Sequence, residues 1–327
     1  MPQGHQFLVL GGAGNVGQWA VHELARRFPE STVRASYRTH GISKPPDHWK
    51  ALRNVEPVEV DLDDPKSIDR AMKGTDRVFF VPQNTPKQLE HDRNILRAIR
   101  SSDTVEFYVR QSAYRAICVP GSACNFLAMH AEAEAALADS GVKYAGVRPN
   151  CGFANIFFLV LPSLPYGGVR WPWPPDLRLA HVDPRDVGAI AALLLATRDI
   201  DQRNGTQVRV MGPAQDTARG IVDLVASKCR VEASYTQIPY EEFKQSLIQG
   251  ANMSEWMADG AAEVLRAMED ACTTGELYVD DTGADGVMPF ESSVGRPKHS
   301  FRDFVDFFSI PAAYERMRQH SNENPNY

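Results

Sequence analysis

A run of glycines near the N-terminus constrains this fold more than any other feature of the sequence. Residues 11–17 read Gly-Gly-Ala-Gly-Asn-Val-Gly, directly after the apolar segment 7–10 and directly before apolar residues at helical spacing. A buried strand that passes through glycines into a helix opens a βαβ unit, where the backbone can approach a pyrophosphate at the positive end of the helix. The run predicts a dinucleotide site, with a ligand-free strand–helix turn as the alternative. The residues expected to contact the cofactor here are Gly11, Gly12, Gly14, Asn15, Val16 and Gly17.

Strand-like and helix-like segments alternate through the first half of the chain. Expected strands cover residues 7–10, 32–37, 57–60, 78–81, 107–109 and 144–147, with expected helices at 16–27, 64–72, 88–100 and 123–139. Connections of this length imply parallel pairing in a doubly wound, Rossmann-type α/β sheet. A helix over 184–197 and a strand over 207–211 would complete the sheet.

A change of composition after Pro149 divides the chain into two parts. We expect a Rossmann domain in residues 1–153, completed by about residues 181–213. Residues 154–180 and 214–327 are then expected to form a smaller, mostly helical substrate-binding lobe. Near the C-terminus, Ser300 and Asp303 have the spacing of a helix capping box.

Charge and composition exclude several classes of protein. The chain has 41 acidic and 35 basic residues, a formal charge of −6, without a basic stripe, so we expect neither nucleic acid nor a membrane surface as partner. Its 5 cysteines include no Cys-x-x-Cys pair, which favours reduced thiols over disulfides or a metal site. The longest apolar runs are too short to span a bilayer. We expect a cytoplasmic monomer or homodimer without a metal.

The end of the second expected strand selects the dinucleotide. NAD sites place a carboxylate there for the ribose hydroxyls, whereas NADP sites need a cation for the 2′-phosphate. Residues 36–40 read Ser-Tyr-Arg-Thr-His, without a carboxylate. Arg38 therefore predicts NADP(H) as the cofactor, because a guanidinium suits a bidentate phosphate contact. The alternative is that Arg38 is a solvated surface residue.

Four stretches that span nearly the whole chain resemble the NmrA-like branch of the atypical short-chain dehydrogenases/reductases. They are the glycine run with Arg38, residues 60–63, residues 130–149 and residues 181–187, and the segment 295–304 is similar to the closing segment of that family. The resemblance implies an NADP(H)-preferring Rossmann domain, with the substrate between it and a small lobe. It implies cofactor contacts from Asp61 and Leu62 at the adenine, from Pro82, Gln83 and Asn84 after the fourth strand, and from Pro149, Asn150 and Phe153 near the nicotinamide.

The catalytic pair of ordinary short-chain reductases is absent. Those enzymes use Tyr-x-x-x-Lys, whereas the corresponding residues here are Phe126 and His130, and phenylalanine has no proton to donate. We expect His130 either to bind the nicotinamide ribose or to donate a proton, since its charge changes near neutral pH; a structural role is the alternative. Ser112 and Tyr114, just beyond the fifth strand, are the other candidate proton donors.

Aromatic residues gather in the segment that leaves the sixth strand, where the substrate cleft is expected. Clustered aromatics with few charges suit a flat, apolar substrate. The prolines beside the two tryptophans suggest a rigid lid, and packing beneath the lobe is the alternative. The residues expected to bind substrate are Phe153, Phe157, Tyr166, Trp171 and Trp173.

These patterns predict an NADPH-dependent oxidoreductase of secondary metabolism. Its substrate would be an apolar aromatic small molecule with a conjugated or aromatic C=O, C=C or C=N (iminium) group, and an iminium acceptor would need no proton. One alternative is a regulatory protein that senses NADP(H) without turnover. Another is an isomerase or cyclase that retains its cofactor. The expected aromatic pocket favours an enzyme over a sensor, which has no need of one.

Overall fold

One large parallel sheet organises the molecule. The computed structural model describes residues 4–38, 45–114, 117–150, 160–275, 287–289 (backbone), 299–307 and Tyr314. The strands of the sheet run in the order β12-β9-β6-β5-β4-β1-β2-β3, and every pair is parallel. Their bounds are β1 Gln6–Leu10, β2 Thr32–Tyr37, β3 Val55–Glu59, β4 Arg77–Phe80, β5 Phe107–Gln111, β6 Tyr144–Pro149, β9 Thr206–Val210 and β12 Val287–Pro289. The strand order 3-2-1-4-5-6 confirms the predicted doubly wound Rossmann-type fold.

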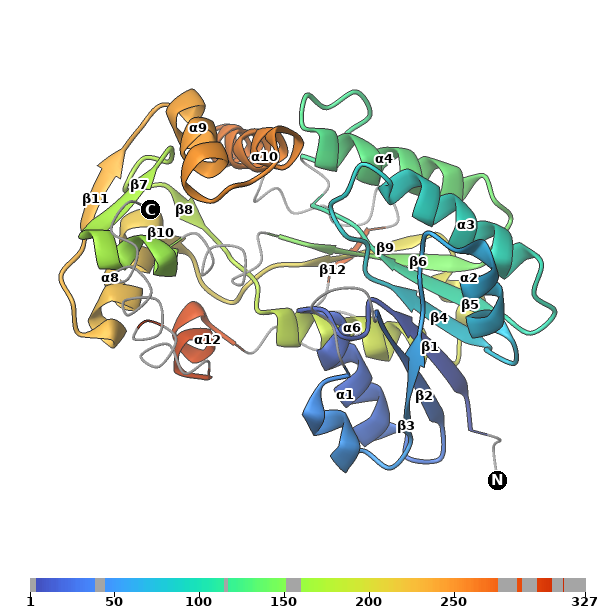
Figure 1. Cartoon of the computed structure of the whole chain (residues 1–327). Coiled ribbons are helices and arrows are strands. Elements are labelled where there is room, and N and C mark those ends of the chain that lie inside the picture. Colours follow the sequence, from blue (N-terminus) through green and yellow to red (C-terminus); the bar gives the residue numbers. More distant parts are fainter. Residues whose placement is uncertain are drawn as a thin grey trace.

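Helices cover both faces of this sheet (Figure 1). On one face lie α1 (Gly17–Arg27) and α6 (Pro184–Leu195), and on the other lie α2 (Pro65–Met72), α3 (Gln88–Arg100) and α4 (Asn125–Ala138). Alternate residues of β1 serve the two cores, since Phe7 and Val9 pack with α1 while Leu8 and Leu10 pack with α2 and α3. Burial on both faces explains why the central strands β1 and β4 are apolar at successive positions, whereas the outer strand β3 carries the exposed residues Glu56 and Glu59.

The expected elements agree with the structure most closely where local signals are strong. The strand over 32–37 and the helix over 88–100 are confirmed residue for residue, and the other elements named above differ at their ends by a few residues. Asp64 and Asp183 cap α2 and α6, each followed by a proline in the first turn. The short strand β12 was not predicted, because three residues are too few to show a period.

The smaller lobe surrounds a core of its own (Figure 1). Two short sheets pair β7 with β11 in parallel and β8 with β10 antiparallel, and helices enclose them. The elements outside the large sheet and its five covering helices are η1 Asp47–Ala51, η2 Leu161–Tyr166, β7 Gly168–Trp171, β8 Arg178–Leu179, α7 Ile200–Arg203, β10 Asp216–Thr217, α8 Ala218–Cys229, β11 Ser234–Gln237, α9 Tyr240–Gly250, α10 Glu255–Thr273 and α12 Phe301–Phe307. Within the described residues, no helix combines the length and apolarity that crossing a membrane requires.

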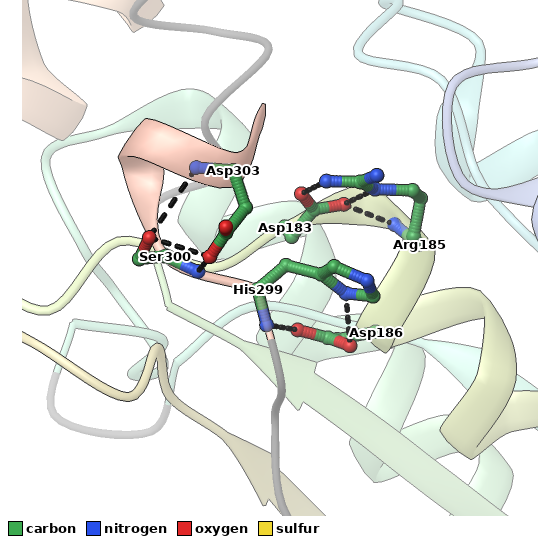
Figure 2. Close-up of polar contacts among 6 residues, drawn as sticks. All are labelled: Asp183, Arg185, Asp186, His299, Ser300 and Asp303. Atoms are coloured by element: carbon green, nitrogen blue, oxygen red, sulfur yellow. Dashed lines mark hydrogen bonds and ion pairs between the residues drawn. The ribbon is translucent and has the colours of Figure 1, made fainter. Parts of the chain in front are cut away.

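Polar contacts tie the C-terminal helix α12 to the Rossmann part, as Figure 2 shows. The carboxylate of Asp186, in the first turn of α6, accepts a hydrogen bond from the backbone N–H of His299 (3.0 Å) and lies 2.8 Å from its Nδ1. The next residue, Ser300, forms the predicted capping box with Asp303, because each side chain bonds the other's backbone N–H. Asp183 therefore caps α6, and Asp186 connects α6 to the residue that precedes Ser300 and α12.

Candidate active site

The glycine loop is fastened to the end of β2. The hydroxyl oxygen of Ser36 accepts hydrogen bonds from the backbone N–H groups of Gly11 (2.8 Å) and Gly12 (3.4 Å). The loop is also too tight for side chains: a Cβ at Gly17 would lie 2.1 Å from the carbonyl oxygen of Gly11, which itself has a φ of +80°. A Cβ at Gly12 would lie 2.9 Å from the backbone nitrogen of Ser36, so the close approach of the chain to itself requires all three glycines.

The outward side of the same loop is open. Gly14 and Asn15 are exposed, and a Cβ at Gly14 would meet only the carbonyl oxygen of Gly11, at 3.1 Å. Val16 precedes α1 without a side-chain cap, so the first amides of this helix face the loop without a side-chain acceptor. Exposed glycine beside an uncapped helix N-terminus fits a pyrophosphate group.

The other predicted cofactor residues follow neighbouring strands at the same edge of the sheet. Arg38 is exposed and lies two residues beyond Ser36, directly after β2. Leu62 follows β3, and Asp61 there accepts a hydrogen bond from the backbone N–H of Asp63 (2.9 Å). Residues 82–84 follow β4, where the glycine loop packs closely against residue 81. The chain therefore brings these residues to the carboxyl edge of the sheet, where Rossmann folds bind dinucleotides.

Asn150 marks the expected nicotinamide end of the site. It follows Pro149, the last residue of β6, and is almost wholly buried. Its backbone N–H donates to the carbonyl oxygen of Val210 and its side-chain Nδ2 to that of Ala180, each at 2.9 Å. Asn150 thus joins the end of β6 to the end of β9 and to the residue after β8. Phe153 and Phe157, also expected here, lie outside the described residues.

Ser112 and Tyr114 lie together just past β5, and both are buried. The hydroxyl of Ser112 is 4.0 Å from the thiol of Cys118, which donates to the carbonyl oxygen of Leu127 on α4. Burial raises the pKa of Cys118 to about 11, so this thiol stays protonated at neutral pH. The phenol oxygen of Tyr114 accepts a hydrogen bond from the guanidinium of Arg209 on β9, at 3.2 Å.

His130 lies on the inner face of α4, one turn beyond Leu127, and is 8% exposed. Its Nδ1 is 3.2 Å from a guanidinium nitrogen of Arg110 on β5. Burial, and then the charge of Arg110, hold the pKa of His130 well below its usual range. The expectation that His130 changes charge near neutral pH is therefore wrong, although a neutral imidazole still donates a hydrogen bond from Nε2.

Phe126, compared above with the tyrosine of ordinary short-chain reductases, packs α4 against α10. Its ring is buried and lies 5.1 Å, centroid to centroid, from that of Trp256 on α10. A Cβ at Gly260 would come within 2.4 Å of the same ring. The neighbouring Asn125 donates to the carbonyl oxygen of Trp256 at 3.1 Å. Phe126 and Asn125 therefore serve the packing between α4 and α10.

The predicted tryptophan lid is wrong. Trp171 and Trp173 are both 0% exposed in the core of the smaller lobe, with ring centroids 4.8 Å apart. Trp173 donates from its indole nitrogen to the carbonyl oxygen of Leu265 at 2.8 Å, which fixes the ring inside the lobe. Their assignment as substrate-binding residues thereby loses its basis. Tyr166, in contrast, is 56% exposed at the end of η2.

Several residues of this site were not anticipated from the sequence. Arg110 is buried and pairs with Asp92 of α3, and a charged residue directly after the apolar run 107–109 was the signal that could have indicated it. Ser36 gave no such signal. Gln88, the first residue of α3, is fully buried, and among the residues that the structure describes neither its amide oxygen nor its amide nitrogen has a hydrogen-bond partner.

Comparisons with known proteins agree with this geometry. The chain is 28% identical over 307 residues (91% of this chain and 96% of the relative) to the (4-alkanoyl-5-oxo-2,5-dihydrofuran-3-yl)methyl phosphate reductase of Streptomyces griseus. It is 22% identical over 301 residues (91% and 96%) to the NAD(P)H azoreductase of Xenophilus azovorans. The NADPH-dependent quinone oxidoreductase of Escherichia coli, solved with NADPH, is similar in fold with a TM-score of 0.71 and 19% identity, over 92% of this chain and 99% of that chain. The NmrA-like family model matches residues 3–295, and the protein therefore belongs to the NmrA-like family.

Proposed function

We propose that this protein is an NADPH-dependent oxidoreductase that reduces a conjugated or aromatic C=O, C=C or C=N group of an apolar small molecule. The observation that carries the proposal is the glycine loop, held closed by Ser36 on one side and open at Gly14 on the other, with Arg38 beside it. The relatives named above support it, since one reduces a furanone, one azo compounds and one quinones.

The residues of the carboxyl edge take distinct tasks in this proposal. The loop amides and the start of α1 hold the pyrophosphate, and Arg38 pairs with the 2′-phosphate. NADPH, when bound, supplies a hydride from its nicotinamide ring. The polar groups that orient the acceptor and the ribose are Ser112 and Tyr114 after β5, Asn150 after β6, and His130 on α4.

Tyr114 is the proton donor that we propose for acceptors that need one. Its phenol oxygen receives a hydrogen bond from Arg209, and a guanidinium there stabilises the negative charge that proton loss would leave. His130 is less suited to this task, because its pKa lies well below its usual range and it therefore carries no labile extra proton at neutral pH. An iminium acceptor would need neither residue as an acid.

Turnover with a panel of acceptors tests this function. NADPH oxidation would be followed with a quinone, an azo dye and a furanone with and without its phosphate, and each reaction repeated with NADH. We expect NADPH to reduce at least one acceptor in a one-to-one ratio, with NADH much less effective. Tight NADPH binding without oxidation by any acceptor would favour a sensor or a cofactor-retaining isomerase. Equal affinity for both dinucleotides would contradict the assignment of Arg38.

A further inference from the structure

Arg110 is held rigidly between an acid and a histidine inside the Rossmann part. Its Nε and Nη2 donate to the two carboxylate oxygens of Asp92, at 2.7 and 2.8 Å, and its Nη1 donates to the carbonyl oxygen of Gln111 at 3.0 Å. The Arg110 side chain is 2% exposed and that of Asp92 11%. The same Nη1 lies 3.2 Å from Nδ1 of His130. A bidentate pair of this kind fixes the plane and position of the guanidinium.

This arrangement determines which nitrogen of His130 carries the proton. A guanidinium has donors but no acceptor, and it stays protonated in proteins. Nδ1 of His130 must therefore accept the bond from Arg110, which places the single proton of the neutral ring on Nε2. The charged groups that face His130 are Arg110 from β5, Asp92 from α3 behind it, and the Glu134–Arg148 pair between α4 and β6. The nearest of these is a cation, which opposes protonation of the ring.

The proton on Nε2 is available to a ligand. Within the described part of the chain, Nε2 of His130 has no hydrogen-bond partner, and it is not among the side-chain nitrogens sealed from solvent. His130 is one turn along α4 from Leu127, whose carbonyl oxygen is linked through Cys118 to Ser112 at the carboxyl edge of β5. The free donor of His130 thus lies in the neighbourhood of the proposed active site.

We propose that Asp92 and Arg110 are positioning residues that hold His130 as a neutral imidazole, so that its Nε2–H donates a hydrogen bond to an oxygen of the bound ligand. The oxygen belongs either to the acceptor's carbonyl group or to a ribose hydroxyl of the cofactor, which share this chemistry. His130 transfers no proton in this role. The inference rests on the proposed function for the identity of the ligand, whereas the state of His130 can be measured without turnover.

Histidine-selective 15N NMR tests the tautomer in the intact protein. We expect the His130 resonance, assigned by its loss in His130→Gln, to show a neutral ring protonated on Nε2 at pH 7 and still at pH 5. A ring protonated on Nδ1, or an imidazolium at pH 6, would overturn the proposal. Because NADPH turnover is not needed, this result is independent of whether the proposed reaction occurs.

Removal of the guanidinium supplies the second test. In Arg110→Gln the amide can donate or accept, so we expect a mixture of tautomers and a His130 that titrates between about pH 5 and pH 7, near its ordinary value. Arg77→Gln is the matched control, because it removes a buried arginine of the neighbouring strand β4 that pairs with Glu106 and does not contact His130, so it should leave the tautomer unchanged. An unchanged His130 in folded Arg110→Gln would refute the role of Arg110. If that variant does not fold, Arg110→Lys, which cannot bridge Asp92 and His130 in the same way, replaces it.

Substitution of His130 identifies the ligand oxygen. The amide nitrogen of glutamine can take the place of Nε2–H, so His130→Gln should keep the wild-type constants to within about threefold, whereas His130→Ala should lose about two- to twelvefold, the effect of one neutral hydrogen bond. A loss in the Kd for NADPH indicates the ribose, and a loss in kcat/KM for the acceptor alone indicates the substrate. Equal losses in both variants would contradict hydrogen-bond donation. If no acceptor is reduced, the Kd for NADPH still shows whether His130 contacts the ribose, and the tautomer of His130 still tests the role of Arg110.

Discussion

The glycine loop and the core of the smaller lobe both stand out in the sequence, yet only the loop has the local geometry that its sequence predicts. Hydrogen bonds join the loop, residues 11–17, to Ser36 in the adjacent strand, and most of the atoms involved belong to the backbone. In the lobe, the ring of Trp173 is held by a hydrogen bond to the carbonyl oxygen of Leu265, which lies far along the chain. A backbone motif carries its geometry with it, whereas the direction of an aromatic ring depends on what the rest of the chain places beside it.

Trp173→Ala should have the largest effect on the lobe. Removal of a fully buried indole is expected to lower the free energy of unfolding by about 3–5 kcal/mol, as for other large-to-small core substitutions. Trp173→Phe leaves the carbonyl oxygen of Leu265 without its donor and a small cavity in place of the lost ring, and it should cost less than Trp173→Ala. Denaturant unfolding measures both. A change in KM for the acceptor with unchanged stability would restore the lid interpretation.

Arg38→Ala tests the glycine loop, the other half of the comparison, through its cofactor affinity. The loss of a charge-assisted phosphate contact is expected to weaken NADPH binding by about 1.5–3 kcal/mol, while NADH affinity stays constant. Arg26→Ala is a suitable control, because that exposed arginine lies in the last turn of α1 and pairs with Glu23. Titration calorimetry with both dinucleotides measures the difference. A similar loss for NADH would show that Arg38 does not contact the 2′-phosphate.

Acid should destabilise the protein through its buried histidines. Burial lowers the pKa of His181 to about 3, below its ordinary value, so the unfolded chain binds the proton more readily than the folded one between these two values. Stability should therefore fall as the pH drops through the ordinary range of histidine, by about 2 kcal/mol from pH 7 to pH 5 for this residue alone. The pKa of His130 is shifted in the same direction.

Urea unfolding at pH 7 and pH 5 measures this loss. The variant His181→Phe serves as control, since it removes the titrating group and should lose less stability between the two pH values than the wild type does. Equal losses in both proteins would show that His181 is not the source.

Tyr166→Ala should give the smallest change in stability. It tests whether an exposed aromatic residue of the smaller lobe contacts the substrate, as the two buried tryptophans were expected to do. The ring is 56% exposed, so the free energy of unfolding should change by less than about 0.5 kcal/mol. If Tyr166 contacts the substrate, as its sequence position predicts, the KM for an aromatic acceptor should rise while the Kd for NADPH stays the same. An unchanged KM would remove Tyr166 from the substrate site.

The sequence alone was sufficient for much of the fold and for the cofactor loop. The order of strands and helices followed from apolar runs, caps and glycines, each of which acts over a few residues. The sequence also showed directly that residue 126 is a phenylalanine and not a tyrosine. What the residue does instead, packing against Trp256, depends on a helix that lies about 130 residues further along.

The tertiary structure decided the charge of His130 and the burial of the two tryptophans. A pKa depends on desolvation and on nearby charges, and the arginine that sets the tautomer of His130 comes from β5 and is held by an acid of α3. The sequence by itself therefore determined the sheet, the glycine loop and the positions of the candidate side chains along the chain. Only folding decided which of those side chains face a ligand, and in which protonation state, because both depend on neighbours that are distant in sequence.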